Sequence, residues 1–159
     1  MNLKLRTAIK SDMESVLLLI KELAIFEKEP DAVEISVDNL IQDGFGKKPA
    51  FKVFVAEIED EIVGMALFYE RYSTWKGKSI HLEDLIIQNK HRGKSIGSAL
   101  YKKVLNYAHD NDYKRVAWEV LDWNKVAIDF YKSTGATVFD EWRVAQMDEK
   151  GLREFCKKK

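Results

Sequence analysis

The chain has 159 residues, of which 46% are hydrophobic and 33% are charged, and its 26 basic residues balance its 26 acidic ones. This length and composition predict a single globular domain over residues 1–159 with a sizeable core. The zero net charge argues against a nucleic-acid partner, the lack of an apolar run of roughly 20 residues argues against a membrane partner, and the lone Cys156 favours a reducing, cytoplasmic location.

The first elements in chain order are a strand and two helices. Residues 3–8 alternate apolar and polar side chains, which predicts a half-buried strand. Ser11 and Glu14 have the spacing of a capping box, and an apolar helical stripe over residues 16–24 follows them until Pro30 ends the pattern. Ser36 is placed to cap a short second helix that stops at residues 44–46.

Strand signals occupy the middle of the chain. Residues 51–58 and 62–69 flank a turn at 59–61 and predict a hairpin. Residues 79–87 predict a third strand, in which Leu82 faces away from His81 and Glu83, and its continuously apolar end is typical of a central strand.

The last part alternates again between helix and strand. A helix is predicted over 95–110, a strand over 116–120, and a helix from an Asn124 cap to Tyr131, with Gly135 at its C-terminal end. Residues 137–147 suggest a closing strand pair, followed by a helical tail. The order predicts an α/β (α+β) fold with a mixed, mostly antiparallel sheet flanked by helices and a late βαβ unit.

The turn at residues 88–98 is the most informative segment, because it joins a buried strand to an amphipathic helix. Small residues between 93 and 98 let a ligand approach the backbone, and the N–H groups of a helix start bind anions. Arg92 and Lys94 add positive charge, so a pyrophosphate fits this turn. An ordinary helix cap explains the turn equally well, and its spacing matches neither a Walker loop nor a Rossmann fingerprint.

Residues 92–97 resemble the R-G-x-G-x-G/A signature with which GNAT-superfamily N-acetyltransferases cradle the pyrophosphate of acetyl-CoA. Ser95 stands where that family usually has glycine, and a strongly positive φ there would weaken the match. Residues 19–27, 43–46 and 82–84 look like the diamine (spermidine/spermine) acetyltransferase branch of the family. Residues 73–77 and 120–124 look more like its sister group, the thialysine Nε-acetyltransferases.

The resemblance implies a single GNAT domain in which a small cationic amine attacks acetyl-CoA, the co-substrate, directly in a ternary complex. It implies that Tyr131 protonates the departing thiolate and that Glu83 is the general base or holds the ammonium. The cofactor-binding residues that it implies are Leu85, Ile86, Ile87, Arg92, Gly93, Lys94, Ser95, Ile96, Gly97, Ser98 and Asn124. The substrate-binding residues that it implies are Phe26, Glu27, Glu83 and Asp84.

The sequence also contains aromatic residues, histidines and a cysteine that have to be considered as substrate-binding or metal-binding residues. Trp75 and Trp123 can line an amine channel through cation–π contacts, although a tryptophan at either position more often serves only packing. The three histidines and Cys156 match no zinc spacing, so no metal is predicted. By resemblance the protein is a homodimer, which no pattern in the chain shows.

Two rival functions stay open. One is acetylation of a polyamine or a protein amine; the polyamine branch carries an aspartate before its Pro-Trp segment, whereas Ser73 and Thr74 precede Trp75 here, which favours lysine-like amines. The other is a non-catalytic acyl-CoA sensor, against which the presence of both Glu83 and Tyr131 argues. The acidic run from Glu27 to Glu34 predicts a substrate with a second positive charge.

Overall fold

The computed structural model describes residues 2–157, which divide into two compact units after Glu119. The first unit holds a five-stranded sheet whose strands lie side by side in chain order. The strands are β1 (Leu3–Thr7), β2 (Lys52–Ile58), β3 (Glu61–Ser73), β4 (Gly77–Ile87) and β5 (Val116–Ala117). The first four pair antiparallel and β4 pairs parallel with β5, which confirms the predicted mixed, mostly antiparallel sheet.

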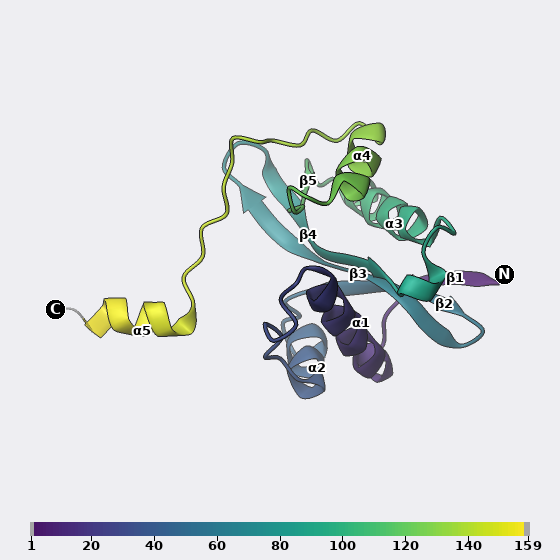
Figure 1. Cartoon of the computed structure of the whole chain (residues 1–159), viewed down its shortest axis with the longest axis horizontal. Helices are drawn as coiled ribbons and strands as arrows, with labels where there is room; N and C mark the ends of the chain where they lie inside the picture. Colours follow the sequence, from purple (N-terminus) through teal and green to yellow (C-terminus); the bar gives the residue numbers. More distant parts are fainter. Residues whose placement is uncertain (1, 158–159) are drawn as a thin grey trace. The chain divides into compact units, whose positions relative to one another are not determined.

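Helices cover both faces of this sheet (Figure 1). One face carries α1 (Met13–Phe26) and α2 (Val37–Phe45), and the other carries α3 (Ile96–Asp110). Two short 3₁₀ turns, η1 (Lys10–Asp12) and η2 (Asn89–His91), precede α1 and α3. The predicted stripe of α1 is buried at Val16, Leu17 and Leu19 against the sheet, where each such side chain contributes about 1.5–3 kcal/mol.

The helix starts follow the predicted caps at one position and depart from them at another. Ser36 caps α2, with its hydroxyl accepting the Asn39 N–H at 3.2 Å, as predicted. The capping box of Ser11 and Glu14 is wrong, because α1 begins at Met13. Asp12 instead accepts the Ile9 N–H at 2.7 Å and pairs with Arg6, whose guanidinium lowers the pKa of the Asp12 carboxyl.

The predicted hairpin is confirmed. Glu59 and Asp60 both have positive φ, 50° and 63°, which is the backbone of the tight turn that suits two twisted antiparallel strands. Strand β3 continues to Ser73, past the predicted end of the strand, and pairs with β4 over its whole second half.

Strand β5 is shorter than the predicted 116–120, because only Val116 and Ala117 pair with β4, opposite Ile80 and His81. The apolar pattern predicts an extended segment, but a strand also requires a neighbouring backbone to exchange hydrogen bonds. Beyond Ala117 this chain leaves β4, and Trp118 packs edge-on against Tyr101 of α3, with ring centroids 5.5 Å apart.

The second unit contains α4 (Lys125–Ser133) and α5 (Glu149–Lys157). Asn124 caps α4 as predicted, accepting the Ala127 N–H at 3.3 Å. Gly135, with φ 90°, ends the helix: its N–H donates to Lys132 at 3.0 Å, and that of Ala136 donates to Tyr131 at 3.2 Å. These two bonds form a Schellman motif, which only a left-handed residue at this position permits.

The predicted strand pair over 137–147 is wrong, since the described residues of this segment form no strand. Its large apolar side chains, such as Phe139 and Trp142, are 62% and 72% exposed. Alternating apolar residues favour extended backbone, but they do not supply the second strand that a ladder requires. The helical tail predicted after it is confirmed as α5. Within residues 2–157 there is no helix with the length and apolarity needed to cross a membrane.

Candidate active site

Strand β4 contains an irregularity at the predicted catalytic carboxylate. Leu67 pairs with Asp84 and Phe68 pairs with Leu82, so Glu83 has no partner on β3. In such a bulge two consecutive residues share one partner position, and the local twist re-aims their side chains. Regular alternation would put Glu83 and Asp84 on opposite faces of the sheet. The bulge therefore allows both carboxylates to serve one site.

A third carboxylate lies near this pair. Glu27 is the C-terminal cap of α1, and burial raises the pKa of its carboxyl. The pKa of Asp84 is raised to about 7, mainly by burial and further by the negative charges of Glu83 and Glu27. Two neighbouring negative charges that raise the pKa of Asp84 mark a site that a cation would stabilise. We call Glu27, Glu83 and Asp84 the carboxylate cluster.

The end of α1 fixes the position of Glu27. Lys28 adopts a left-handed conformation with φ 67°, and its N–H donates to Ile25 at 3.1 Å. The N–H of Glu29 donates to Ala24 at 2.9 Å, which completes a Schellman motif. The helix therefore ends after Phe26, well before Pro30, and the backbone of Glu27 is fixed as its C-terminal cap.

Two residues that the sequence analysis did not single out as site residues contact Glu83. The Tyr69 hydroxyl donates to Glu83 Oε2 at 2.9 Å, and His81 Nε2 lies 3.5 Å from the same oxygen. Burial and this hydrogen bond raise the pKa of Tyr69 to about 12, so its hydroxyl remains a donor. The β3–β4 hairpin pairs Tyr69 with His81, two residues before Glu83. A sequence prediction of this pairing would have indicated both residues as neighbours of Glu83.

The predicted cofactor strand has an open edge. Leu85, Ile86 and Ile87 pair with β3 on one side. On the other side, β5 pairs with β4 only at Ile80 and His81, so within the described residues no strand follows this edge from Leu82 onward. Backbone N–H and C=O groups on an open edge accept an extended, amide-containing ligand as an added strand would.

The turn before α3 has the backbone that an anion requires. Gly93 and Ser95 have φ of 75° and 60°, and in the described chain no side chain caps the start of α3 at Ser95. The first N–H groups of the helix, at Ile96, Gly97 and Ser98, are therefore left without the Ser95 side-chain cap and can bind an anion. Ser95 stands where the family usually has glycine, and its φ of 60° is the positive value that weakens the match to the family signature at this position. This conformation costs a non-glycine residue about 1 kcal/mol.

Side chains tie this turn to α1. Arg92 Nε donates to the Ile87 carbonyl at 3.1 Å, and its guanidinium carbon lies 5.1 Å from the centre of the Phe26 ring. The Asn89 N–H donates to Glu22 Oε1 at 2.8 Å. Arg92 thus bridges the turn before α3 and the end of α1, whereas Lys94 is exposed beside it.

The remaining predicted residues lie on the hairpin tip and on the second unit. Trp75 is 78% exposed on the β3–β4 turn, where Ser73 Oγ accepts the N–H groups of Trp75 and Lys76 at 3.2 and 3.1 Å. Asn124, Trp123 and Tyr131 belong to the second unit, and Trp123 is 41% exposed. The carboxylate cluster, the open edge of β4 and the turn before α3 therefore all belong to the first unit.

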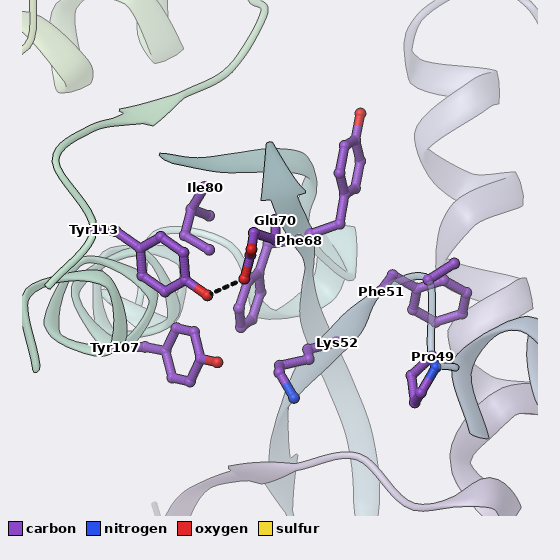
Figure 2. A pocket seen from close by; sticks show the side chains of 10 residues that line it. Pro49, Phe51, Lys52, Phe68, Glu70, Ile80, Tyr107 and Tyr113 are labelled. Atoms are coloured by element: carbon purple, nitrogen blue, oxygen red, sulfur yellow. Dashed lines mark hydrogen bonds between the residues drawn. The ribbon is translucent and has the colours of Figure 1, made fainter. Parts of the chain in front are cut away.

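A pocket of about 260 Å³ lies on the α3 face of the first unit. Figure 2 shows Glu70, Tyr107 and Tyr113 facing one another there, with the Tyr113 hydroxyl donating to Glu70 at 2.6 Å. Phe68, whose ring centroid lies 5.2 Å from that of Tyr107, forms part of its wall. Tyr69, the partner of Glu83, also lines this pocket.

An open strand edge, an uncapped helix start and a cluster of carboxylates fit an enzyme that binds a phosphate-bearing co-substrate and a cationic second substrate. Residues 17–136 match the acetyltransferase (GNAT) family, and the chain belongs to this family. It is an acetyl-CoA-dependent amine N-acetyltransferase.

Three comparisons illustrate its relationships. The chain is 40% identical to thialysine N-epsilon-acetyltransferase of Bos taurus, over 97% of each chain. It is 34% identical to the human spermidine/spermine N(1)-acetyltransferase-like protein 1, over 84% of this chain and 20% of that protein. An integron cassette protein from the mobile metagenome of V. cholerae superposes with a TM-score of 0.79 at 25% identity, over 99% of each chain.

Proposed function

We propose that this enzyme acetylates the primary amine of a small molecule that carries a second positive charge, such as thialysine, lysine or a short diamine. The carboxylate cluster is the observation that carries this proposal, because three acidic groups at one site exceed what a single reacting ammonium requires. Relatives that share 40% identity and nearly the full length are thialysine N-epsilon-acetyltransferases, which agrees with a lysine-like acceptor.

Backbone groups of the predicted cofactor residues bind the pantetheine arm of acetyl-CoA, whereas N–H groups and basic side chains bind its pyrophosphate. The open edge at Leu85, Ile86 and Ile87 pairs with the amides of the pantetheine arm. The N–H groups of residues 93–98 and the charges of Arg92 and Lys94 hold the pyrophosphate. The family resemblance also assigns Asn124 to the cofactor. A Cβ at Gly97 would make only an ordinary contact with Ile87, 3.6 Å away, so packing does not require this glycine and its missing side chain leaves room for the ligand. Bound acetyl-CoA supplies the activated acetyl group that the amine attacks directly in a ternary complex.

The proton transfers are assigned to two side chains. The substrate ammonium, with an ordinary pKa of roughly 10, has to lose a proton before its nitrogen can attack, and Glu83 accepts that proton directly or through water. Tyr131 donates its hydroxyl proton to the departing thiolate, since a phenol stays protonated at neutral pH. This assignment requires that the two units act together as one GNAT domain.

The distal end of the substrate is held by charge and by aromatic faces. Glu27 and Asp84 pair with the second cationic group, beside Phe26 at the end of α1. Trp75 and Trp123, both of which expose their rings, add cation–π contacts along the channel.

We further propose a homodimer, which the resemblance to the diamine branch implies. Exposed apolar side chains at Phe139, Trp142, Val144, Leu152 and Phe155 support an additional contact surface in the second unit. A cytoplasmic location is consistent with the single cysteine, Cys156. Sedimentation equilibrium at micromolar concentration tests the dimer, and a purely monomeric protein contradicts it.

A thiol-release assay with acetyl-CoA and a panel of amines tests the function. We expect thialysine, lysine and short diamines to exceed a monoamine of equal length in kcat/KM. Spermidine or spermine exceeding all of them would favour the polyamine alternative, and turnover on peptide amines alone would favour protein acetylation. Binding of acetyl-CoA without turnover on any amine would favour a non-catalytic sensor.

A further inference from the structure

Two side chains converge on one oxygen of Glu83. Tyr69 Oη and His81 Nε2 lie 2.9 and 3.5 Å from Glu83 Oε2, and the rings of Tyr69 and His81 pack with centroids 5.2 Å apart. Tyr69 and His81 are register partners on β3 and β4, so the ladder itself fixes their side chains on one face. No contact of this kind is seen for the other oxygen of Glu83 among the described residues.

The neighbour of His81 determines which of its nitrogens carries a proton. Arg71 Nη1 lies 3.4 Å from His81 Nδ1, and a guanidinium has donors but no acceptor. Nδ1 therefore accepts, and the ring proton sits on Nε2, facing Glu83. His81 is only 7% exposed, so its ring orientation is held by packing as well as by Arg71.

We propose that Tyr69 and His81 are positioning residues that hold Glu83 through Oε2 and leave Oε1 as the oxygen that takes the proton of the substrate ammonium. This inference rests on the proposed function. In this step an N–H bond of the ammonium breaks, an O–H bond to Oε1 forms, and the nitrogen keeps the electron pair with which it attacks the acetyl carbon. His81 already carries a proton on Nε2, so it does not relay this proton, and the exposed Glu83 releases it to solvent.

Several other charges face this group and have to be separated from the effect of the two donors. Asp84 follows Glu83 on β4, Glu27 lies at the end of α1, Arg71 lies behind His81, and Glu119 acts on Tyr69 from beyond β5. None of these supplies a hydrogen bond to Glu83 in the described chain, so removal of the Tyr69 hydroxyl is the cleanest perturbation.

The first experiment measures Tyr69→Phe by steady-state kinetics. We expect kcat/KM for the amine to fall about tenfold, which is the loss of one hydrogen bond to a charged group, while the KM for acetyl-CoA stays unchanged. The acidic limb of the pH profile of kcat/KM should move to higher pH, because the ionised carboxylate loses a donor. Tyr72→Phe, an exposed tyrosine on the same strand, is the matched control.

The second experiment compares two replacements of His81. His81→Gln keeps an N–H donor near the position of Nε2 and should retain most of the activity, whereas His81→Leu should lose about as much as Tyr69→Phe. Glutamine and leucine have side chains of similar size, but only glutamine has an N–H donor. Higher activity of His81→Gln than of His81→Leu would therefore show that His81 acts by donating a hydrogen bond and not only by packing. Equal losses in the two variants would overturn the role assigned to His81.

A double-mutant cycle completes the test. In a Glu83→Gln background, Tyr69→Phe should cause no further loss, because both act through the same carboxylate. A Tyr69→Phe variant with wild-type kinetics and pH profile, or the same loss in both backgrounds, would overturn the inference alone. No turnover by the wild-type protein on any amine would overturn the proposed function and this inference with it.

Discussion

At the scale of single residues, the phenol of Tyr131 has the most specific assignment. Tyr131→Phe should lower kcat at least about 100-fold, the usual contribution of a general acid, because the thiolate then departs without a proton. The KM for acetyl-CoA should change little, since the lost interaction acts during bond breaking. Stopped-flow or thiol-release kinetics measure both values, and an unchanged kcat at every pH would remove Tyr131 from the mechanism.

Glu27 allows the predicted second charge of the substrate to be tested. Glu27→Gln should narrow the ratio of kcat/KM between a diamine and a monoamine of equal length several-fold at low salt, because the desolvation that raises the pKa of Glu27 also strengthens its attraction to a charged partner. Glu29→Gln, at a neighbouring exposed carboxylate outside the carboxylate cluster, is the control. If a monoamine matches the diamines at low salt in the wild-type enzyme, the substrate does not need a second positive charge.

At the scale of an element, Ser95 carries backbone strain at the start of α3. Ser95→Gly should stabilise the protein by about 1 kcal/mol, because glycine adopts a φ of 60° without a Cβ clash. The KM for acetyl-CoA should fall or stay constant, since the N–H groups of the turn are retained. Urea unfolding and kinetics measure the two effects, and a destabilised variant would show that the Ser95 side chain has an important contact of its own.

Gly64 and Gly97 are the second test at this scale, because both face Ile87 of β4. A Cβ on Gly64 would clash with the Ile87 side chain and lie 2.9 Å from the Ile86 carbonyl oxygen, whereas one on Gly97 would lie 3.6 Å from Ile87. Gly64→Ala should therefore destabilise by about 1–3 kcal/mol, whereas Gly97→Ala should fold normally. Bulkier residues at Gly97 should raise the KM for acetyl-CoA far more than that for the amine; equal effects on both KM values would contradict the placement of the pyrophosphate.

At the scale of the whole molecule, Asp84 links stability to pH. Its pKa rises from an ordinary 3.8 to about 7, so the folded protein binds this proton more tightly than the unfolded chain does. Protonated Asp84 therefore makes its whole contribution to the free energy of unfolding below pH about 4, and this contribution is lost as the pH rises to about 7. Asp84→Asn should remove this fall and exceed the wild type at pH 8 by at most about 4 kcal/mol.

Urea midpoints measured from pH 4 to pH 8 test this dependence. The difference between variant and wild type is the informative quantity, because Asp12, with its lowered pKa, gives stability the opposite slope at acidic pH. A saturating diamine should restore wild-type stability at pH 8, since a bound cation favours the ionised Asp84. A variant that is less stable than the wild type at pH 8 would contradict the cause assigned to this pKa.

The sequence by itself determined the order of nearly all elements, the caps at Ser36 and Asn124, the glycine that ends α4 and the turn between β4 and α3. These features depend on residues within a few positions of one another, so local patterns encode them. The capping-box pattern predicted the wrong start for α1. The helix begins after Asp12, whose carboxylate is held by Arg6 of β1, a contact that the local pattern does not include. Apolar patterns also overextended β5 and predicted strands over 137–147, since alternation does not reveal whether a second backbone is present.

Only the tertiary structure decided how the candidate site is assembled. The alternation of Leu82, Glu83 and Asp84 predicts opposite faces for the two carboxylates, and the bulge against Leu67 and Phe68 overrides it. The contacts of Tyr69 and His81 with Glu83 depend on the β3–β4 register, and the raised pKa of Asp84 depends on Glu27, which is distant in the chain. Strand register and burial are set by packing between distant segments, which is why a local reading of the sequence named the acids but not their arrangement.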